Sequence, residues 1–309
     1  MSGKIVVVGS SNTDMIIKTP SLPRAGETVL GGEFSMAAGG KGANQAVAAA
    51  RAGGNVTLIA CLGEDIFGEQ ALEGFVGDGI NVEHIFRDSD TPSGIALIFV
   101  DEGGENSIAV ASGANARLMP RHIEQAEEAI ASADILVMQL ETPIETVNAV
   151  AVLAASHDVK VILNPAPARP LEGEILRHVS ILTPNETEAV MLTGIRIRNG
   201  KGAEKAAGAL LNMGVDAALI TMGAGGAYLA TPDSGEMVTG YGVRSVDTTG
   251  AGDVFNGALA TALAEGRTLL EAARFANAAA ALSVTKLGAQ PSVPHRKEID
   301  YFLKAHGGL

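Results

Sequence analysis

The most constraining feature of this sequence is a regular alternation of short apolar stretches with longer helix-forming stretches. The first strand is expected at Lys4–Gly9, where the residues from Ile5 to Val8 are all β-branched and a glycine ends the run. Further strands are expected at Val56–Cys61, Val82–Arg87, Ile135–Gln139, Val159–Asn164 and Ala217–Met222. Helices are expected at Ala43–Ala52, Phe67–Asp78, Pro120–Ser132, Pro143–His157 and Gly202–Met213. Strands separated by helices of this length favour a doubly wound α/β domain with a mainly parallel sheet.

Two stretches break this alternation. Met15–Phe34 contains short strand-like pieces separated by prolines and glycines. Ser93–Val100 and Asn106–Val110 flank the turn Asp101-Glu102-Gly103-Gly104 and predict a β-hairpin. We expect a small β subdomain, built from segments of approximately 13–35 and 92–112, within a single domain that spans residues 1–309. It is either a lid over a ligand site or a purely structural extension.

Composition and charge exclude several classes of protein. Hydrophobic residues make up 47% of the chain, enough for a sizeable core and against wholesale disorder. A formal net charge of −13 argues against a nucleic-acid-binding surface, although a local positive pocket could still bind a small anion. The single Cys61 fits a reducing compartment, and no apolar run approaches the roughly 20 residues that span a bilayer. We therefore expect a cytoplasmic protein without a membrane segment.

The strongest local signal is Asp247-Thr248-Thr249-Gly250-Ala251-Gly252-Asp253, which leads into the helix expected at Val254–Glu265. Backbone N–H groups at a helix start are unpaired and partly positive, and glycines let an anion approach them closely. Asp253 would compete with such an anion unless it had its own task, such as accepting a proton during phosphoryl transfer. From spacing alone, Asp253 could equally be an ordinary first-turn acid favoured by the helix dipole.

A second glycine cluster, Gly39-Gly40-Lys41-Gly42-Ala43-Asn44, also opens a helix. Lys41 and Asn44 lie three positions apart and share one helical face, where they could bind hydroxyl groups or an anion. The alternative is a solvated helix start. Lys41 is followed by glycine rather than by Ser or Thr, so this cluster is not a Walker A loop.

Polar residues also follow several expected strands. Asn12 and Asp14 come after the first strand, and Glu141 comes after the strand at Ile135–Gln139. Ligands of open α/β sheets bind beyond the carboxyl ends of the strands, so these side chains could line one crevice, although each alone could be a turn or cap residue. The cluster Gly223-Ala224-Gly225-Gly226 is explained equally well by a turn between two strands. The sequence has no G-x-S-x-G elbow, no G-x-G-x-x-G turn and no zinc-ligand spacing of its histidines.

Taken together, these segments resemble the ribokinase family of carbohydrate kinases over essentially the whole chain. The family's two signature regions are similar to Gly39–Ala46 and Asp247–Ala258, and its N-x-x-E motif is similar to Thr183–Glu188. The segment Lys286–Ser292 is similar to the family's C-terminal segment. The resemblance implies a three-layer α/β/α body with an inserted β-sheet lid. It also implies ATP-dependent phosphorylation of the 5-hydroxyl of D-ribose, which gives ribose 5-phosphate.

The resemblance also implies roles for individual residues. Asp253 would be the catalytic base, and Gly250, Ala251 and Gly252 would form the anion hole. The sugar would be held by Asn12, Asp14, Gly40, Lys41, Asn44, Glu141 and Asp253. ATP would be contacted by Asn185, Thr221, Gly223, Gly226, Gly252 and Asn277, while Glu188 orders Mg²⁺ and its waters. An activating K⁺ would lie near Asp247, Thr249, Ser283, Lys286, Gly288 and Ser292, several of them acting through carbonyl oxygens.

The charged residues of the expected sugar pocket narrow the range of substrates within such a family. The sugar pocket would carry a net negative charge, because it contains three acids, Asp14, Glu141 and Asp253, and one base, Lys41. This charge would repel a phosphosugar unless Arg24 or Arg87 extended into the pocket from the lid. Few aromatic side chains lie near the lid to hold a nucleoside base. A neutral pentose is favoured, with deoxyribose, fructose or a nucleoside as alternatives. A non-catalytic sugar-binding regulator would be marked by loss of Asp253 or of the anion-hole glycines, and all of them are present.

Related kinases often pair through their lid sheets, so the resemblance also suggests a homodimer. Ile95, Leu97 and Phe99 alternate along one face of the expected hairpin and would suit such a contact. The same face could instead pack on the body of the domain.

Overall fold

A nine-stranded sheet forms the centre of the protein, whose structure is a computed structural model that describes residues 3–171 and 173–307. From one edge to the other, the strands are β13 (Ser234–Thr239), β12 (Gly226–Thr231), β11 (Ala217–Thr221), β10 (Ile181–Leu182), β9 (Lys160–Leu163), β8 (Ile135–Met138), β1 (Lys4–Val8), β4 (Asn55–Gly63) and β5 (Ile85–Asp88). Every pair from β11 to β5 is parallel, and only the β11–β12 and β12–β13 pairs are antiparallel. The predicted mainly parallel sheet is confirmed.

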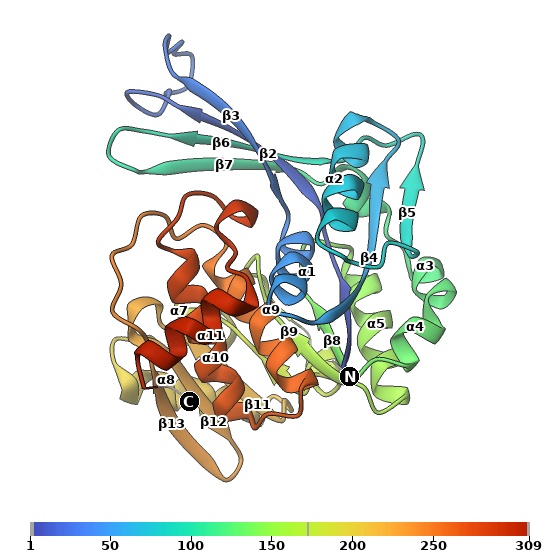
Figure 1. The fold of residues 1–309 in the computed structure, drawn as a ribbon, viewed down its shortest axis with the longest axis vertical. Coiled ribbons are helices and arrows are strands. Elements are labelled where there is room, and N and C mark those ends of the chain that lie inside the picture. Colours follow the sequence, from blue (N-terminus) through green and yellow to red (C-terminus); the bar gives the residue numbers. More distant parts are fainter. Residues whose placement is uncertain (1–2, 172, 308–309) are drawn as a thin grey trace.

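Helices cover both faces of this sheet, because its strands are apolar on both sides. In β1, Ile5 and Val7 belong to one hydrophobic core and Val6 and Val8 to the other. The first core is closed by α1 (Lys41–Arg51), α2 (Ile66–Gly77), α9 (Ala251–Ala264), α10 (Leu269–Ser283) and α11 (Arg296–Ala305). The second is closed by α3 (Pro120–Gln125), α4 (Glu127–Ala131), α5 (Ile144–Ser156), α6 (Gly173–Leu176), α7 (Glu186–Thr193) and α8 (Gly200–Asn212). The three layers expected from the resemblance are therefore present (Figure 1).

One helix that was predicted to be continuous is divided in two, so that prediction is wrong. The stretch predicted as a single helix, Pro120–Ser132, is divided into α3 and α4 at Ala126. The N–H of Ala126 donates to the carbonyl of Ile123 at 3.0 Å, three residues back instead of four, so the α-helical ladder is interrupted there. Neither glycine nor an internal proline marks this break in the sequence.

A separate four-stranded sheet, called here the small sheet, consists of β3 (Glu33–Gly39), β2 (Asn12–Lys18), β6 (Gly94–Val100) and β7 (Asn106–Ala111) in that order. It projects away from the body of the molecule (Figure 1). The predicted hairpin is confirmed as β6–β7, and its turn is held by Asp101, whose Oδ1 accepts the N–H groups of Gly103 and Glu105. Large apolar side chains of the small sheet are exposed, namely Phe34, Met36, Leu97, Ile108 and Val110.

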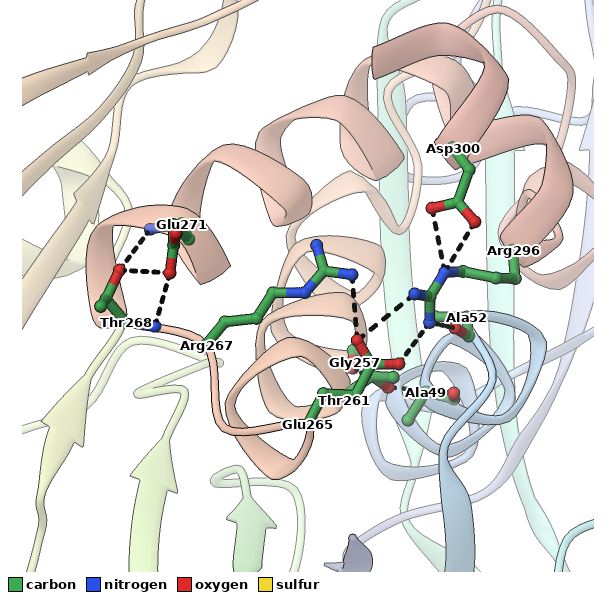
Figure 2. Close-up of polar contacts among 10 residues, drawn as sticks. All are labelled: Ala49, Ala52, Gly257, Thr261, Glu265, Arg267, Thr268, Glu271, Arg296 and Asp300. Atoms are coloured by element: carbon green, nitrogen blue, oxygen red, sulfur yellow. Dashed lines mark hydrogen bonds and ion pairs between the residues drawn. The ribbon is translucent and has the colours of Figure 1, made fainter. Parts of the chain in front are cut away.

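Helices α1 and α9 lie unusually close together because Gly257 has no side chain. A Cβ at this position would collide with the backbone of α1 at Gln45 and Ala49. Thr261, one turn further along α9, donates its hydroxyl to the carbonyls of Ala49 and Gly257, each at 3.0 Å (Figure 2). The close approach at Gly257 sets the relative position of two helices whose first turns carry Lys41, Asn44 and Asp253.

An ion-pair network supports the far ends of the same helices. Figure 2 shows Arg296 of α11 bound to Glu265, to Asp300 and to the carbonyl of Ala52 at the end of α1. Arg267 also pairs with Glu265, at 3.0 Å. None of the helices in the described ranges is long and apolar enough to cross a membrane.

Candidate active site

The site lies where the strand order reverses. Strand β1 pairs with β4 on one side and with β8 on the other. In open α/β sheets, ligands bind beyond the carboxyl ends of the strands at such a point. Ser10 follows β1, and Gln139 to Glu141 follow β8. The first turns of α1 and α9 meet at the same place, because Asn44 of α1 is hydrogen-bonded to Asp253 of α9. The predicted crevice is therefore assembled from four separate parts of the chain.

Asp253 lies in the first turn of α9 and is almost completely buried. Its Oδ2 accepts the side-chain N–H of Asn44 at 2.9 Å, and its Oδ1 accepts that of Gln45 at 2.9 Å. Burial raises the pKa of Asp253, and the charge of Glu141 adds to this effect, whereas Lys41 and the two amide donors oppose it. A buried carboxylate held in this way suits a proton acceptor, because a raised pKa makes the ionised carboxylate a stronger base.

The start of α9 is open to a ligand. Gly250 caps the helix with a φ of 73°, a left-handed conformation that glycine adopts without strain. A Cβ added at Gly252 would meet nothing within 4 Å. Gly252 also lines the adjacent cavity, so an anion could approach its backbone closely. The N–H of the third predicted anion-hole residue, Ala251, donates to the carbonyl of Thr248 at 3.2 Å.

The side of the site predicted to hold a sugar is crowded with charged groups. Glu141 accepts the hydroxyl of Ser10 at 2.5 Å and the backbone N–H of Lys41 at 3.0 Å through the same oxygen, Oε2. Burial alone would lower the pKa of Lys41, but the surrounding carboxylates of Asp253, Glu141, Glu188 and Asp14 raise it. Lys41 therefore stays protonated among these acids and offsets part of their charge.

Asp14 enters the site from strand β2 of the small sheet. Burial, followed by the charges of Glu141 and Asp253, raises the pKa of Asp14 from 3.8 to about 6, and Lys41 opposes the shift. The backbone at Gly39 and Gly40 packs so closely against β2 and the residues before it that neither position has room for a side chain. A Cβ at Gly39 would collide with the Asp14 carboxylate, and one at Gly40, where φ is 87°, would collide with the backbone at Ser11 and Asn12.

Asn12 is held by a residue that the sequence did not reveal. Asn115, which is buried, donates to Asn12 Oδ1 at 2.7 Å and to the carbonyl of Ser11 at 3.1 Å. Asn115 Oδ1 also accepts the N–H of Ser11 at 2.8 Å. This asparagine therefore fixes the turn that carries the predicted sugar-binding residues out of β1 and into β2.

A cavity of about 450 Å³ adjoins the start of α9. All six residues predicted to contact ATP line it: Asn185, Thr221, Gly223, Gly226, Gly252 and Asn277. Val243, Phe255, Ala280, Ala281 and Val284 give the cavity apolar walls. The glycine cluster at Gly223–Gly226 is a short turn between β11 and β12, as the alternative reading allowed, and it also forms part of this wall. The volume and lining suit a drug-sized ligand with an apolar ring.

Asn185 and Glu188 form a reciprocal cap at the start of α7. Asn185 Oδ1 accepts the N–H of Glu188 at 2.8 Å, while Glu188 accepts the backbone and side-chain N–H groups of Asn185 at 2.8 and 2.9 Å. Burial raises the pKa of Glu188, with the hydrogen bond from Asn185 and the charge of Lys41 opposing the shift. Glu188 is thus a further acid, besides Asp14 and Glu141, within electrostatic reach of Lys41 and Asp253.

The residues predicted to surround a monovalent cation lie on two segments that the structure brings together. Asp247 Oδ2 accepts the N–H of Gly288 at 2.8 Å, and the N–H groups of Val246 and Asp247 donate to the carbonyl of Val284. Partial burial would raise the pKa of Asp247, but hydrogen bonds from Thr249 and Gly288 hold it below its ordinary value. The Lys286 ammonium points elsewhere and pairs with Glu298 at 3.0 Å, so only the backbone of Lys286 can serve this site.

Comparison with known proteins agrees with this geometry. The family model described as pfkB family carbohydrate kinase matches residues 2–296. The chain belongs to this family. The ribokinase of Haemophilus influenzae is 45% identical over 304 residues, which cover 98% of this chain and 99% of that one. The deoxyribokinase of Salmonella typhi is 37% identical over 300 residues, covering 97% and 98%.

Members of the family also share the fold. The structure described as Arabidopsis thaliana ribokinase complexed with ribose and ATP superimposes with a TM-score of 0.92 at 34% identity, covering 98% of this chain and 99% of that one. The resemblance drawn from the sequence motifs is therefore confirmed, as is the expected fold class.

Proposed function

We propose that this protein transfers the γ-phosphoryl group of ATP to the 5-hydroxyl of D-ribose, with Asp253 as the general base. Membership of a carbohydrate kinase family and close similarity to a ribokinase support the reaction. The observation that carries the proposal is the position of Asp253. It follows Gly252, which lines the nucleotide cavity, and it is hydrogen-bonded to Asn44 on the sugar side.

The residues of this chain account for each part of the transfer. The sugar hydroxyl gives its proton to Asp253, its oxygen forms a bond to the γ-phosphorus, and ADP leaves with the electrons of the broken P–O bond. The N–H groups and dipole at the start of α9 stabilise the charge that develops on the transferred group. Asp14, Asn12, Lys41, Asn44 and Glu141 hold the sugar hydroxyls so that one of them faces Asp253.

Two cations fit residues of the site. Bound Mg²⁺ would neutralise phosphate charge. Glu188 would hold the waters of this ion, because its buried carboxylate lies within electrostatic reach of Lys41 and Asp253. K⁺ would be held by the segments around Asp247 and Gly288, where a charged carboxylate and several carbonyls provide the oxygen ligands that hard cations prefer.

We propose that the small sheet is a lid and that it also joins two copies of the chain. Its strand β2 carries Asp14 into the sugar pocket, so movement of the sheet would open or close that pocket. Its exposed apolar residues on the face opposite Asp14, namely Phe34, Met36 and Leu97, would be covered in a homodimer. The single buried Cys61 is consistent with a cytoplasmic location.

A panel of acceptors tests the function. ADP release is measured with MgATP and K⁺ in the presence of ribose, deoxyribose, fructose, adenosine or fructose 6-phosphate. We expect turnover to be strongest with ribose. Turnover with deoxyribose alone, the substrate class in the name of the Salmonella relative, would keep the kinase and overturn the assigned pentose. Turnover with none of these acceptors would leave a sugar-binding regulator or a kinase of another sugar.

A further inference from the structure

A chain of buried amides lies behind Asp253, on the side away from the substrate pockets. Gln45 of α1 has no exposed surface and donates through Nε2 to Asp253 Oδ1 at 2.9 Å. The same nitrogen donates to Asn164 Oδ1 at 3.1 Å, and Gln45 Oε1 accepts the N–H of Gln139 at 2.7 Å. Gln139 and Asn164, which follow β8 and β9, are themselves buried. Each hydrogen-bonding atom of the Gln45 amide is therefore occupied.

The chemistry of the partners fixes which way the Gln45 amide faces. An ionised carboxylate only accepts hydrogen bonds, so the amide nitrogen and not the oxygen must face Asp253. Gln139 then has to present its own nitrogen to Gln45 Oε1. At the far end, Asn164 is anchored by donating to the carbonyl of Thr183 at 3.2 Å. The amides therefore have one consistent set of orientations.

We infer that Gln45, supported by Gln139, is a positioning residue that holds the Asp253 carboxylate in the rotation needed to accept the sugar proton. The inference rests on the proposed role of Asp253 as the base. The terminal torsion of an aspartate is intrinsically broad, so a carboxylate bound through only one oxygen can turn. Asn44 holds Oδ2 from the sugar side, and Gln45 holds Oδ1 from the interior. Because Gln45 is fully buried, it acts through Asp253 and contacts neither substrate.

Gln45→Met tests this role, because methionine has a similar length and no amide. We expect kcat to fall about 10- to 100-fold and the KM for ribose to change less than about threefold. The acid limb of the kcat profile should move to higher pH. An N–H donor stabilises the ionised carboxylate, so removing it raises the pKa of Asp253 further.

A second variant, Gln139→Met, acts on Asp253 indirectly, through Gln45. Gln139 Nε2 donates to Gln45, and Gln139 Oε1 has no partner among the described residues, so Gln139→Met removes one hydrogen bond and leaves the contact between Gln45 and Asp253 intact. It should shift the acid limb in the same direction by a smaller amount. This variant keeps the test usable if Gln45→Met does not fold.

Thr261→Val is the matched control, since it removes a buried hydroxyl from α9, the helix that carries Asp253, and the hydrogen bonds of that hydroxyl go to the carbonyls of Ala49 and Gly257 (Figure 2). It should lower the melting temperature while leaving kcat and its pH profile unchanged. If Gln45→Met behaves like Thr261→Val, Gln45 is only structural and the inference is wrong. Asp253→Asn tests the role of Asp253 as the base separately from the role of Gln45. If this variant keeps full turnover, the base assignment is wrong, and the inference about Gln45 is wrong with it.

Discussion

The two halves of the proposed active site would recognise their ligands by different means. On the proposed sugar side, neighbouring charges act on the pKa values of Asp14, Lys41 and Asp253. Hydrogen bonds from neighbouring side chains hold Glu141 and Asp253 in place. On the nucleotide side, the cavity is lined by glycine backbone at Gly223, Gly226 and Gly252 and by apolar side chains.

This difference predicts which side of the site discriminates between alternative substrates. A pocket of buried polar groups penalises a ligand that lacks a matching hydroxyl, because protein groups are then left unpaired. An apolar cavity with backbone contacts to phosphate discriminates only weakly between nucleotides whose base rings carry different substituents. The sugar side should therefore set substrate choice, and the nucleotide side should mainly position the phosphoryl donor.

The largest effect should come from Asp253→Asn, because the asparagine side chain fits the same space but cannot accept the proton. We expect kcat to fall about 10²- to 10⁴-fold. The dissociation constant for ribose, measured by calorimetry, should change only a few-fold. Unchanged turnover would remove Asp253 from the mechanism.

Gly252→Val should have the next largest effect, because it places a side chain in the open space at the start of α9. We expect kcat/KM for ATP to fall about 10²-fold, as when a preorganised anion site is lost, while ribose binding stays unchanged. Gly208→Val is a suitable control, since Gly208 also lies in a helix and its Cβ would also meet nothing within 4 Å. Equal loss of activity in both variants would mean that the effect is not local.

The sugar side should also show a pH dependence that the nucleotide side lacks. The pKa of Asp14 is raised to about 6, so this carboxyl group is neutral below pH 6 and charged above it. If the ionised form binds sugar hydroxyls, the KM for ribose should rise about tenfold for each pH unit below 6. Asp14→Asn should flatten this limb and raise the KM for ribose about 10-fold at pH 8. A limb that persists in the variant would have to come from another group.

The smallest effect should come from Asn185→Ala, which removes the cap of α7. Loss of a cap costs about 1 kcal/mol of stability, and we expect a rise of a few-fold in the KM for ATP with no change in the KM for ribose. Asn199→Ala removes the equivalent cap of α8, where Asn199 accepts the N–H of Gly202 at 3.1 Å. It should lower the melting temperature similarly but leave both KM values unchanged.

Much of the body could be predicted from local pattern. The strands β1, β4, β8 and β9 and the helix α1 were expected within two residues of their observed bounds, because β-branched runs and alanine-rich runs differ sharply. The hairpin β12–β13 and the helices α10 and α11 were not predicted from the sequence. The break at Ala126 could not be predicted, since the residues around it all favour a helix.

The site was predicted through its motifs, whereas the groups behind it were missed. Gln45 directly follows Asn44 in a motif, but no spacing rule indicates that it reaches Asp253, which lies 208 residues away along the chain. One signal was available: Gln45 is a lone glutamine in a helix that is otherwise rich in alanine. Asn115, Gln139 and Asn164 are brought to the site only by tertiary packing.

The comparison between the two sides can be tested most directly with the unmodified enzyme. We would measure kcat/KM for ribose and 2-deoxyribose with ATP, and for ATP and GTP with ribose. The account predicts that the ribose preference exceeds the ATP preference by about 10-fold or more, because only the sugar pocket leaves buried charges unpaired. A nucleotide preference equal to or larger than the sugar preference would contradict it.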